Sequence, residues 1–198
     1  MRFDEQQIIQ KIRDGDKTAF REVVEKHKRN IYYLALDLTG NHHDAEDLAQ
    51  DVFVQMFRSL HTFRGESTLN AWLYRITVNL CINKKRKKAL TAMKLKEDFS
   101  REQSENISFD GGHIHSNPER STDSGLAQQH INTALQSLSD RERSVFVLRH
   151  YKDLPLKDIA ATLQIAEGTV KGLLFRAVHK LQKELAFYRK DLGLEASE

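Results

Sequence analysis

Residues 44–60 read DAEDLAQDVFVQMFRSL and carry the most regular apolar pattern of the chain. Apolar side chains recur there every three or four residues over about four turns, which predicts an amphipathic α-helix with one face in a core. The predicted core stripe contains Ala45, Leu48, Ala49, Val52, Phe53, Met56, Phe57 and Leu60. The opposite face presents Asp47, Gln50, Asp51, Val54 and Arg58. An aliphatic side chain ringed by polar groups is typical of a docking surface, although a solvated helix face with one valine fits equally well.

The same spacing continues on both sides of this stretch. Asp16 is a candidate N-cap for a helix that ends at Gly40-Asn41, and Ser67 is a candidate N-cap for a helix that runs into a basic cluster. From about residue 89 to 125 the periodicity fades among Ser, Asn, Asp and Gly, and so long a stretch is rare inside one compact domain. We therefore expect two helical domains, 1–90 and 126–198, joined by a linker at 91–125.

Composition agrees with an all-α protein. The 198 residues include only two prolines and nine glycines, which is few for a turn-rich sandwich or barrel. The single cysteine, Cys81, excludes an intrachain disulfide or a cysteine-cluster zinc site, and it is expected to be a small buried hydrophobe. No apolar run approaches the roughly 20 residues of a membrane span, and no signal peptide opens the chain. The expected location is cytoplasmic, without membrane insertion.

The segment 156–176 has the spacing of a helix-turn-helix. Ser139 and Glu142 form a capping box before it, Ala160 is small where the two helices must cross, and Gln164 occupies a turn position that usually takes glycine. The inward positions are Ile159, Ala160, Leu163, Ile165, Val170, Leu173, Leu174, Ala177, Val178 and Leu181. The outward positions are Thr169, Lys171, Gly172, Phe175, Arg176, His179, Lys180 and Lys183. These polar, cationic and aromatic groups suit the DNA major groove, whereas the alternative is a helical hairpin with a solvated basic face.

The segment 61–88 mixes aromatic, amide and cationic residues. They are Phe63, Arg64, Asn70, Trp72, Tyr74, Arg75, Asn79, Asn83, Lys84 and Arg86. Such groups stack on unpaired bases, bind base edges and neutralise phosphates, although Trp72 also fits the core stripe. Residues 84–88 are five basic residues in a row, whereas 37–51 contains five acids and no Lys or Arg. The net charge of +3 is thus the sum of an acidic segment and a basic segment, and this opposite charge indicates two kinds of partner.

Five motifs resemble those of bacterial extracytoplasmic-function (ECF) sigma factors. In order they are DAEDLAQDVF (44–53), FRGESTLNAWLYRITVN (63–79), LSDRERSVFVLR (138–149), EGTVK (167–171) and FRA (175–177). The resemblance implies a two-domain, all-helical initiation subunit of RNA polymerase. Region two would bind the clamp coiled coil of core polymerase and melt the minus-ten element. Region four would bind the minus-thirty-five element and the polymerase flap, and an anti-sigma factor, often membrane-bound, would regulate the protein.

The resemblance also assigns residues. Asp47, Leu48, Gln50, Asp51 and Phe53 match the core-binding motif, and Val54 joins them from the docking face. The loop 63–72 and the helix 75–86 match the minus-ten reader. Thr169, Lys171, Phe175 and Arg176 match the minus-thirty-five reader, with Gly172 and Lys180 on the same face. The pairs Leu69-Asn70 and Gly172-Leu173 depart from the family pattern and remove polar DNA contacts.

Two other classes of function stay open at this point. A free-standing helix-turn-helix regulator would need the DNA-reading helix but neither the acidic face nor the aromatic loop. A nucleic-acid enzyme would need a catalytic or metal site, and the only candidate clusters are His42-His43-Asp44 and His113 with His115. Neither supplies three or four ligands at a recognisable spacing. We expect no metal, no cofactor and no catalytic residue.

Overall fold

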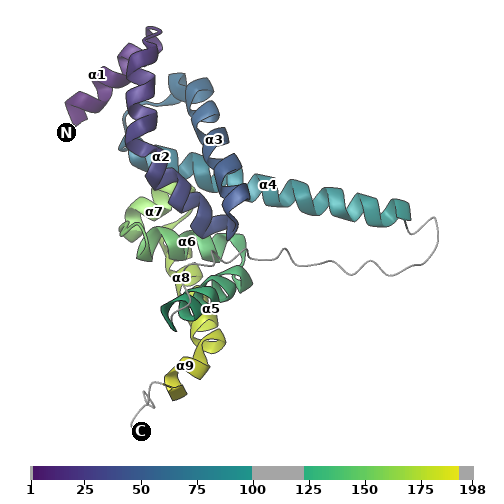
Figure 1. The fold of residues 1–198 in the computed structure, drawn as a ribbon. Helices are drawn as coiled ribbons and strands as arrows, with labels where there is room; N and C mark the ends of the chain where they lie inside the picture. Colours follow the sequence, from purple (N-terminus) through teal and green to yellow (C-terminus); the bar gives the residue numbers. More distant parts are fainter. Residues whose placement is uncertain (1, 100–122, 192–198) are drawn as a thin grey trace.

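The computed structural model describes residues 2–99 and 123–191, and every regular element in these two ranges is a helix (Figure 1). The predicted all-α fold is confirmed. The first range contains α1 (Arg2–Arg13), α2 (Lys17–Thr39), α3 (His42–Ser59), the short 3₁₀ helix η1 (Leu60–Thr62) and α4 (Leu69–Phe99). The second contains α5 (Asp123–Ser137), α6 (Asp140–His150), α7 (Leu156–Leu163), α8 (Glu167–Glu184) and α9 (Ala186–Asp191).

Helices α2, α3 and the first half of α4 pack against one another around an apolar core. Asp16 caps α2 by accepting hydrogen bonds from the amides of Thr18 and Ala19, and Gly40 ends it in the left-handed region at φ 73°, as predicted. The N-cap of α4 differs from the prediction. The amide of Ala71 donates to the Thr68 hydroxyl at 3.2 Å, so the cap is Thr68 and not Ser67. Ser67 and Thr68 are adjacent and both can cap a helix, so the sequence alone does not say which one does.

Helix α4 continues beyond the body of the protein (Figure 1). It passes residue 90, where we placed the end of the first domain, and runs to Phe99. Leu90 and Met93 are exposed on this extension. Of the rest of the proposed linker, residues 100–122 lie outside the described residues, and residues 123–125 belong to α5, which begins before the expected domain start at 126.

The second range forms the predicted helix-turn-helix from α7 and α8. Ser139 and Glu142 make the capping box of α6, with both reciprocal hydrogen bonds present. Gln164 takes the left-handed conformation at φ 55° and ψ 46°, a conformation that costs a residue other than glycine about 1–2 kcal/mol. The buried side chains of Ile159, Val170 and Ala177 hold the two helices on the core, as their spacing predicts.

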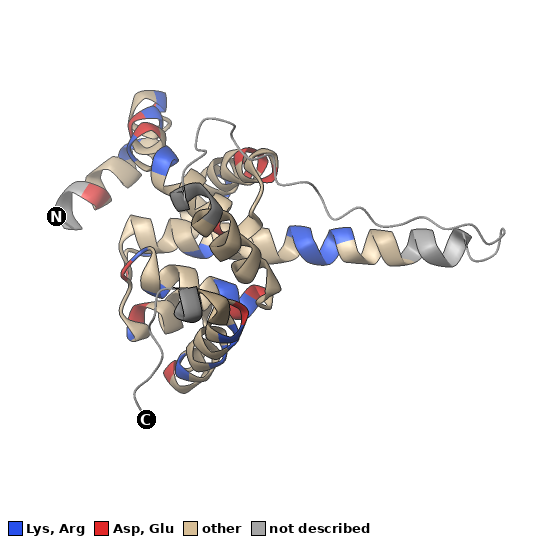
Figure 2. Cartoon of the chain, turned by 60° about the horizontal axis from the view of Figure 1, so that its bottom comes forward, with Lys and Arg blue, Asp and Glu red and all other residues tan. Residues whose placement is uncertain are grey.

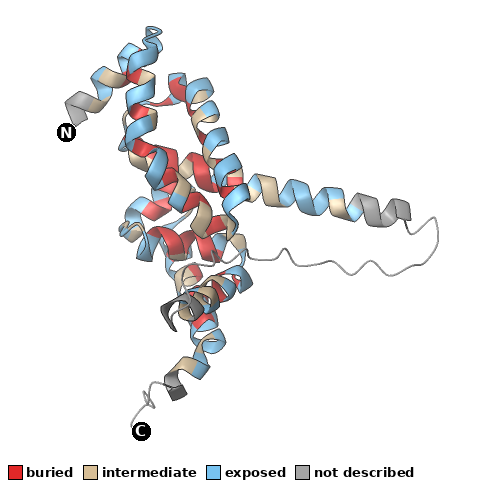
Figure 3. Cartoon of the chain, viewed as in Figure 1, coloured by how far each residue is buried: buried red, intermediate tan, exposed pale blue. Residues whose placement is uncertain are grey.

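The two halves of the chain share one continuous core (Figure 3). Helix α6 packs on α2, and α7 packs on α4. The Arg143 side chain on α6 is 3% exposed. Its Nη1 donates to the Leu38 carbonyl of α2 at 2.8 Å, and its Nε donates to the Leu135 carbonyl at 2.7 Å. Two ion pairs flank this contact, Lys85 with Asp140 at 3.0 Å and Lys152 with Asp37 at 3.3 Å.

Candidate functional site

The outer face of α3 combines acids with exposed apolar side chains. Asp47, Gln50 and Asp51 are exposed, and Val54 is 48% exposed, as predicted. Phe57 is 62% exposed, so its prediction as a core residue is wrong. It lies one turn after Val54 at the edge of the apolar stripe, and its ring meets that of Phe20 edge-on, with the centroids 5.3 Å apart. Its position three residues after Val54 is the sequence signal that could have placed it on this face.

Two residues of the core-binding motif are less accessible. Leu48 is completely buried, so it supports α3 from below and does not reach the surface. Phe53 is half-buried and packs against the same core. The accessible docking face, as we use the term below, therefore consists of Asp47, Gln50, Asp51, Val54 and Phe57.

Ion pairs connect the acidic helix to the basic cluster of α4. Lys84 Nζ lies 2.6 Å from Asp51 Oδ2, and Lys88 Nζ lies 2.9 Å from Asp44 Oδ1. The basic residues form a band on α4 where it leaves the body (Figure 2). The surfaces that the sequence assigns to two partners are thus adjacent, and Asp51 and Lys84 neutralise each other in the protein alone.

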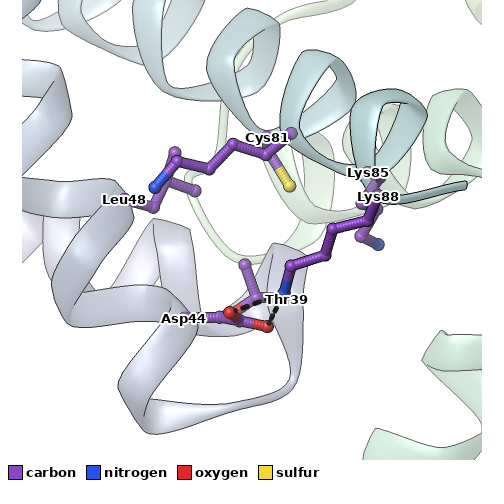
Figure 4. Close-up of a pocket in the computed structure, with 7 residues that line it drawn as sticks. Thr39, Asp44, Leu48, Cys81, Lys85 and Lys88 are labelled. Atoms are coloured by element: carbon purple, nitrogen blue, oxygen red, sulfur yellow. Dashed lines mark hydrogen bonds and ion pairs between the residues drawn. The ribbon is translucent and has the colours of Figure 1, made fainter. Parts of the chain in front are cut away.

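A small hollow lies between α2, α3 and α4 beneath these pairs (Figure 4). It is lined by Thr39, Asp44, Leu48, Cys81, Lys84, Lys85 and Lys88. Its volume of about 40 Å³ accommodates water but no organic cofactor. Burial raises the pKa of the Cys81 thiol, which keeps the sulfur protonated and unreactive. Cys81 is therefore the buried hydrophobe that the sequence predicts.

The loop that begins at Phe63 is built on two buried aromatic rings. Phe63 and Trp72 are both buried, with ring centroids 5.1 Å apart. Trp72 is thus a core residue in this structure, the alternative that its spacing allowed, and neither ring is on the surface. The Asn70 side-chain oxygen is also buried, without a hydrogen-bond partner among the described residues, beside His27. Burial lowers the pKa of His27, so its imidazole is neutral at pH 7.

The cations and amides of this segment are more accessible. Arg64, Asn79, Asn83 and Arg86 are exposed, and Arg75 and Lys84 are partly exposed. Residues 75, 79, 83 and 86 are three or four positions apart on α4, so they share one face of the helix. The structure thus gathers Arg75, Asn79, Asn83 and Arg86 on one face of α4, whereas Lys84 lies on another side of the helix and faces Asp51.

Helix α8 presents the predicted DNA-reading face to solvent. Thr169, Lys171, Arg176 and Lys180 are exposed, and Phe175 is 75% exposed with its ring stacked on His179. Gly172 lies on the same helix, and a Cβ there would meet only Arg176 Nη1, at 3.7 Å. The helix would therefore accept a side chain at position 172, and glycine is not required by packing.

One residue behind this face was assigned only a capping role by the sequence. The Glu142 carboxylate accepts a hydrogen bond from Lys180 Nζ at 2.8 Å and lies 3.5 Å from Arg176 Nε. Burial by itself would raise the pKa of Glu142, but the bonds from Lys180 and from the Ser139 amide and hydroxyl outweigh it and hold the pKa at about 2. Glu142 is thus ionised at pH 7 and fixes two cations of the DNA-reading face.

The candidate metal clusters do not assemble in the described part of the chain. His42 Nδ1 bonds the Tyr32 hydroxyl at 2.6 Å, and His43 faces Asp47 at 3.8 Å. Within residues 2–99 and 123–191, no three His, Cys, Asp or Glu side chains are grouped to hold a metal ion. His113 and His115 lie outside the described residues. Among the described helices, none is long and apolar enough to cross a membrane.

Comparison with known proteins yields matches over both halves of the chain. Residues 23–91 match the Sigma-70 region 2 family, and residues 134–183 match the Sigma-70, region 4 family. The RNA polymerase sigma-H factor of Pseudomonas aeruginosa is 31% identical over 185 residues, covering 91% of this chain and 93% of that protein. The ECF RNA polymerase sigma factor SigW of Bacillus subtilis is 32% identical over 184 residues, covering 89% and 94%.

Solved structures agree with these matches. The sigma factor RpoE from Bartonella quintana, in complex with the anti-sigma factor NepR, has a TM-score of 0.64 and 27% identity, covering 84% of this chain and 96% of that one. CnrH, in complex with the cytosolic domain of CnrY, shares the fold with a TM-score of 0.63 at 21% identity, covering 92% and 97%. Both regions occur here in the family order, and a free-standing helix-turn-helix regulator would not need the first. The chain belongs to the ECF group of sigma-70 family RNA polymerase sigma factors.

Proposed function

We propose that this chain joins core RNA polymerase and directs it to promoters through three separate surfaces, without chemistry of its own. Transcription initiation by this chain would take place in the cytoplasm, where core polymerase is located. One observation carries the proposal: an acidic and apolar face on α3 is combined with cationic faces on α4 and α8 in one molecule. A protein that only bound duplex DNA would need the third surface alone.

The docking face of α3 would bind the clamp coiled coil of the polymerase. Val54 and Phe57 supply apolar area, while Asp47 and Asp51 surround them with negative charge. Apolar side chains at the centre of a polar rim are where binding energy concentrates in protein interfaces. Leu48 and Phe53 would support this face from the core side, and region four would contact the flap.

The minus-ten element would be opened and held by the loop after Phe63 and by α4. Arg64, Arg75 and Arg86 would bind phosphates or stack on unpaired bases, and Asn79 and Asn83 would bind base edges. Lys84, on another side of α4, would bind a phosphate only after release from Asp51. Phe63 and Trp72 would form the floor of the base-binding site, and Asn70 would reach it only by turning outward.

The minus-thirty-five element would be read by α8 in the major groove. Thr169, Lys171 and Phe175 lie in its first turns, where a recognition helix meets base edges, and Phe175 suits a thymine methyl. Arg176 and Lys180 would bind phosphates. The Gly172-Leu173 pair leaves this helix with fewer polar contacts to DNA than the family pattern would supply.

A pull-down with core polymerase followed by run-off transcription tests the proposal. The wild-type chain should be retained by the polymerase and should support promoter-specific transcripts. Asp51→Ala should weaken polymerase binding, whereas Glu22→Ala, which removes an exposed acid on α2, should not. A chain that never joins the polymerase would refute the proposal and favour a free-standing regulator. Unchanged affinity of Asp51→Ala would refute the docking face alone.

An anti-sigma factor is the remaining proposed partner. One similar solved structure is a complex of a sigma factor with an anti-sigma factor, which supports this partner for the present chain. A membrane-bound anti-sigma factor should be recovered in detergent extracts with the tagged chain and should release it when the inducing signal arrives. Recovery of the tagged chain with polymerase alone under every condition would argue against such regulation.

A further inference from the structure

Helix α1 has no role in the function proposed above. It precedes residue 23, where the match to region 2 begins. Ile9 and Ile12 are buried in the core, so the helix is firmly seated on the domain. Three of its polar side chains, Glu5, Gln6 and Arg13, nevertheless lie against the segment between η1 and α4 that we propose as the minus-ten loop.

Arg13 holds the beginning of that segment. Its Nη2 donates to the Leu60 carbonyl at 3.1 Å and to the Phe63 carbonyl at 2.7 Å. One guanidinium nitrogen thus ties together the two ends of the turn from which the loop departs. Hydrogen bonds from a charged donor are stronger than those from a neutral one, so this turn is fixed more firmly than its own backbone bonds would allow.

Glu5 holds the other end of the segment. Its Oε2 accepts a hydrogen bond from the Leu69 amide at 3.3 Å, at the first residue of α4. The first amides of a helix lack partners within the helix, and a carboxylate there is favoured by the helix dipole. Between these anchors, Gly65 has φ 74° and lies so close to Gln6 that a Cβ would stand 3.1 Å from its Nε2. Helix α1 therefore contacts the loop at its beginning, middle and end.

We propose that α1 is a positioning element for promoter opening, in which Arg13 and Glu5 hold the 63–68 loop in the shape that captures unpaired minus-ten bases. Neither residue needs to touch DNA. A site must be held within about 0.5 Å of its productive geometry to keep its selectivity, and a loop bonded at both ends to a helix that Ile9 and Ile12 anchor in the core meets that need. The inference rests on the proposed role of the loop in minus-ten capture.

The test uses holoenzyme assembled from core polymerase and the full chain. A promoter is first selected by wild-type holoenzyme from a library randomised at the minus-ten element. Opening is then followed by 2-aminopurine fluorescence on the selected promoter and on one with substituted minus-ten bases. The ratio of the two opening rates measures base discrimination. Arg13→Gln should lower this ratio about tenfold, since small misplacements of a prearranged group cost up to about 100-fold.

Matched variants distinguish an effect on loop position from an effect of lost charge and from a folding defect. Arg13→Lys should restore part of the ratio, because an ammonium can still bond one of the two carbonyls. Lys11→Gln, an exposed charge on the same helix, should leave the ratio unchanged. Glu5→Ala, which removes the acceptor of the Leu69 amide, should lower it, and it provides a second route if Arg13→Gln fails to fold. Polymerase affinity and minus-thirty-five duplex affinity should stay at wild-type values in every folded variant.

The outcomes are distinct. A folded Arg13→Gln or Glu5→Ala variant whose ratio stays within twofold of wild type would overturn the inference. If Lys11→Gln lowered the ratio of opening rates as much as Arg13→Gln does, the inference would also be overturned, because loss of positive charge alone would then explain the effect. If wild-type holoenzyme itself showed no minus-ten discrimination, the proposed function of the loop would fail first, independently of α1.

Discussion

Replacing Glu142 with glutamine should lower the free energy of unfolding by about 1–2 kcal/mol at neutral pH, and that loss should vanish in acid. Glutamine can keep the capping-box bond from the Ser139 amide, because its side-chain oxygen still accepts. The variant loses the charge that faces Lys180 at 2.8 Å and Arg176 at 3.5 Å. The substitution therefore isolates the electrostatic part of the contact from the helix cap.

The magnitude follows from the pKa. The ordinary pKa of a glutamate is 4.5, and that of Glu142 is about 2, a difference that corresponds to about 3 kcal/mol at about 1.4 kcal/mol per pKa unit. Lys180 and Arg176 are about half exposed, and screening by solvent reduces the figure to about 1–2 kcal/mol. Because the pKa is lower in the folded state, the stabilisation is complete above pH 4.5 and is lost as the pH falls towards 2.

Urea unfolding followed by circular dichroism measures this effect. The free energies of wild type and Glu142→Gln should differ at about pH 7, approach each other below pH 4.5 and meet at about pH 2. Glu184→Gln, the same change at an exposed position of α8, should stay within about 0.5 kcal/mol of wild type throughout. A difference that stayed constant from neutral pH to about pH 3 would refute the reasoning, because it would show that the Glu142 charge is not its source.

Two further predictions test the shared core and the DNA-reading face. Arg143→Met removes four hydrogen bonds from a charged donor and should cost about 2–3 kcal/mol in urea unfolding, although Lys85 Nζ still donates to the Leu38 carbonyl. Lys152→Met, at the rim of the same contact, should cost less; equal losses would contradict the central role of Arg143. Lys171→Ala should weaken binding to a minus-thirty-five duplex, measured by fluorescence anisotropy. If Lys171 contacts a phosphate, the slope of log affinity against log salt should also fall by about 0.9. Lys157→Ala, an exposed lysine of α7, is the matched control; equal effects of the two variants would contradict the assignment to α8.

Much of the local structure could be predicted because it depends on neighbours in sequence. Asp16, Gly40 and the Ser139–Glu142 box act over three or four residues, and the structure places all of them as expected. The helix-turn-helix follows from the spacing of apolar residues around Gln164, whose left-handed conformation is required by the turn itself. The candidate faces of α3, α4 and α8 also follow from helical periodicity, since residues three or four apart share a side.

The tertiary structure decided what those faces meet. Phe57 fits the apolar stripe of α3 in sequence, yet the edge contact with Phe20 leaves its side chain 62% exposed. Three contacts join residues that are far apart in sequence. Asp51 pairs with Lys84, Arg13 donates to the Leu60 carbonyl and Arg143 donates to the Leu38 carbonyl, over 33, 47 and 105 positions. Such contacts depend on how whole helices pack. The sequence by itself therefore determined the helices, the caps of α2 and α6 and the family, whereas packing determined the cap of α4, which charges are neutralised and which loop is held.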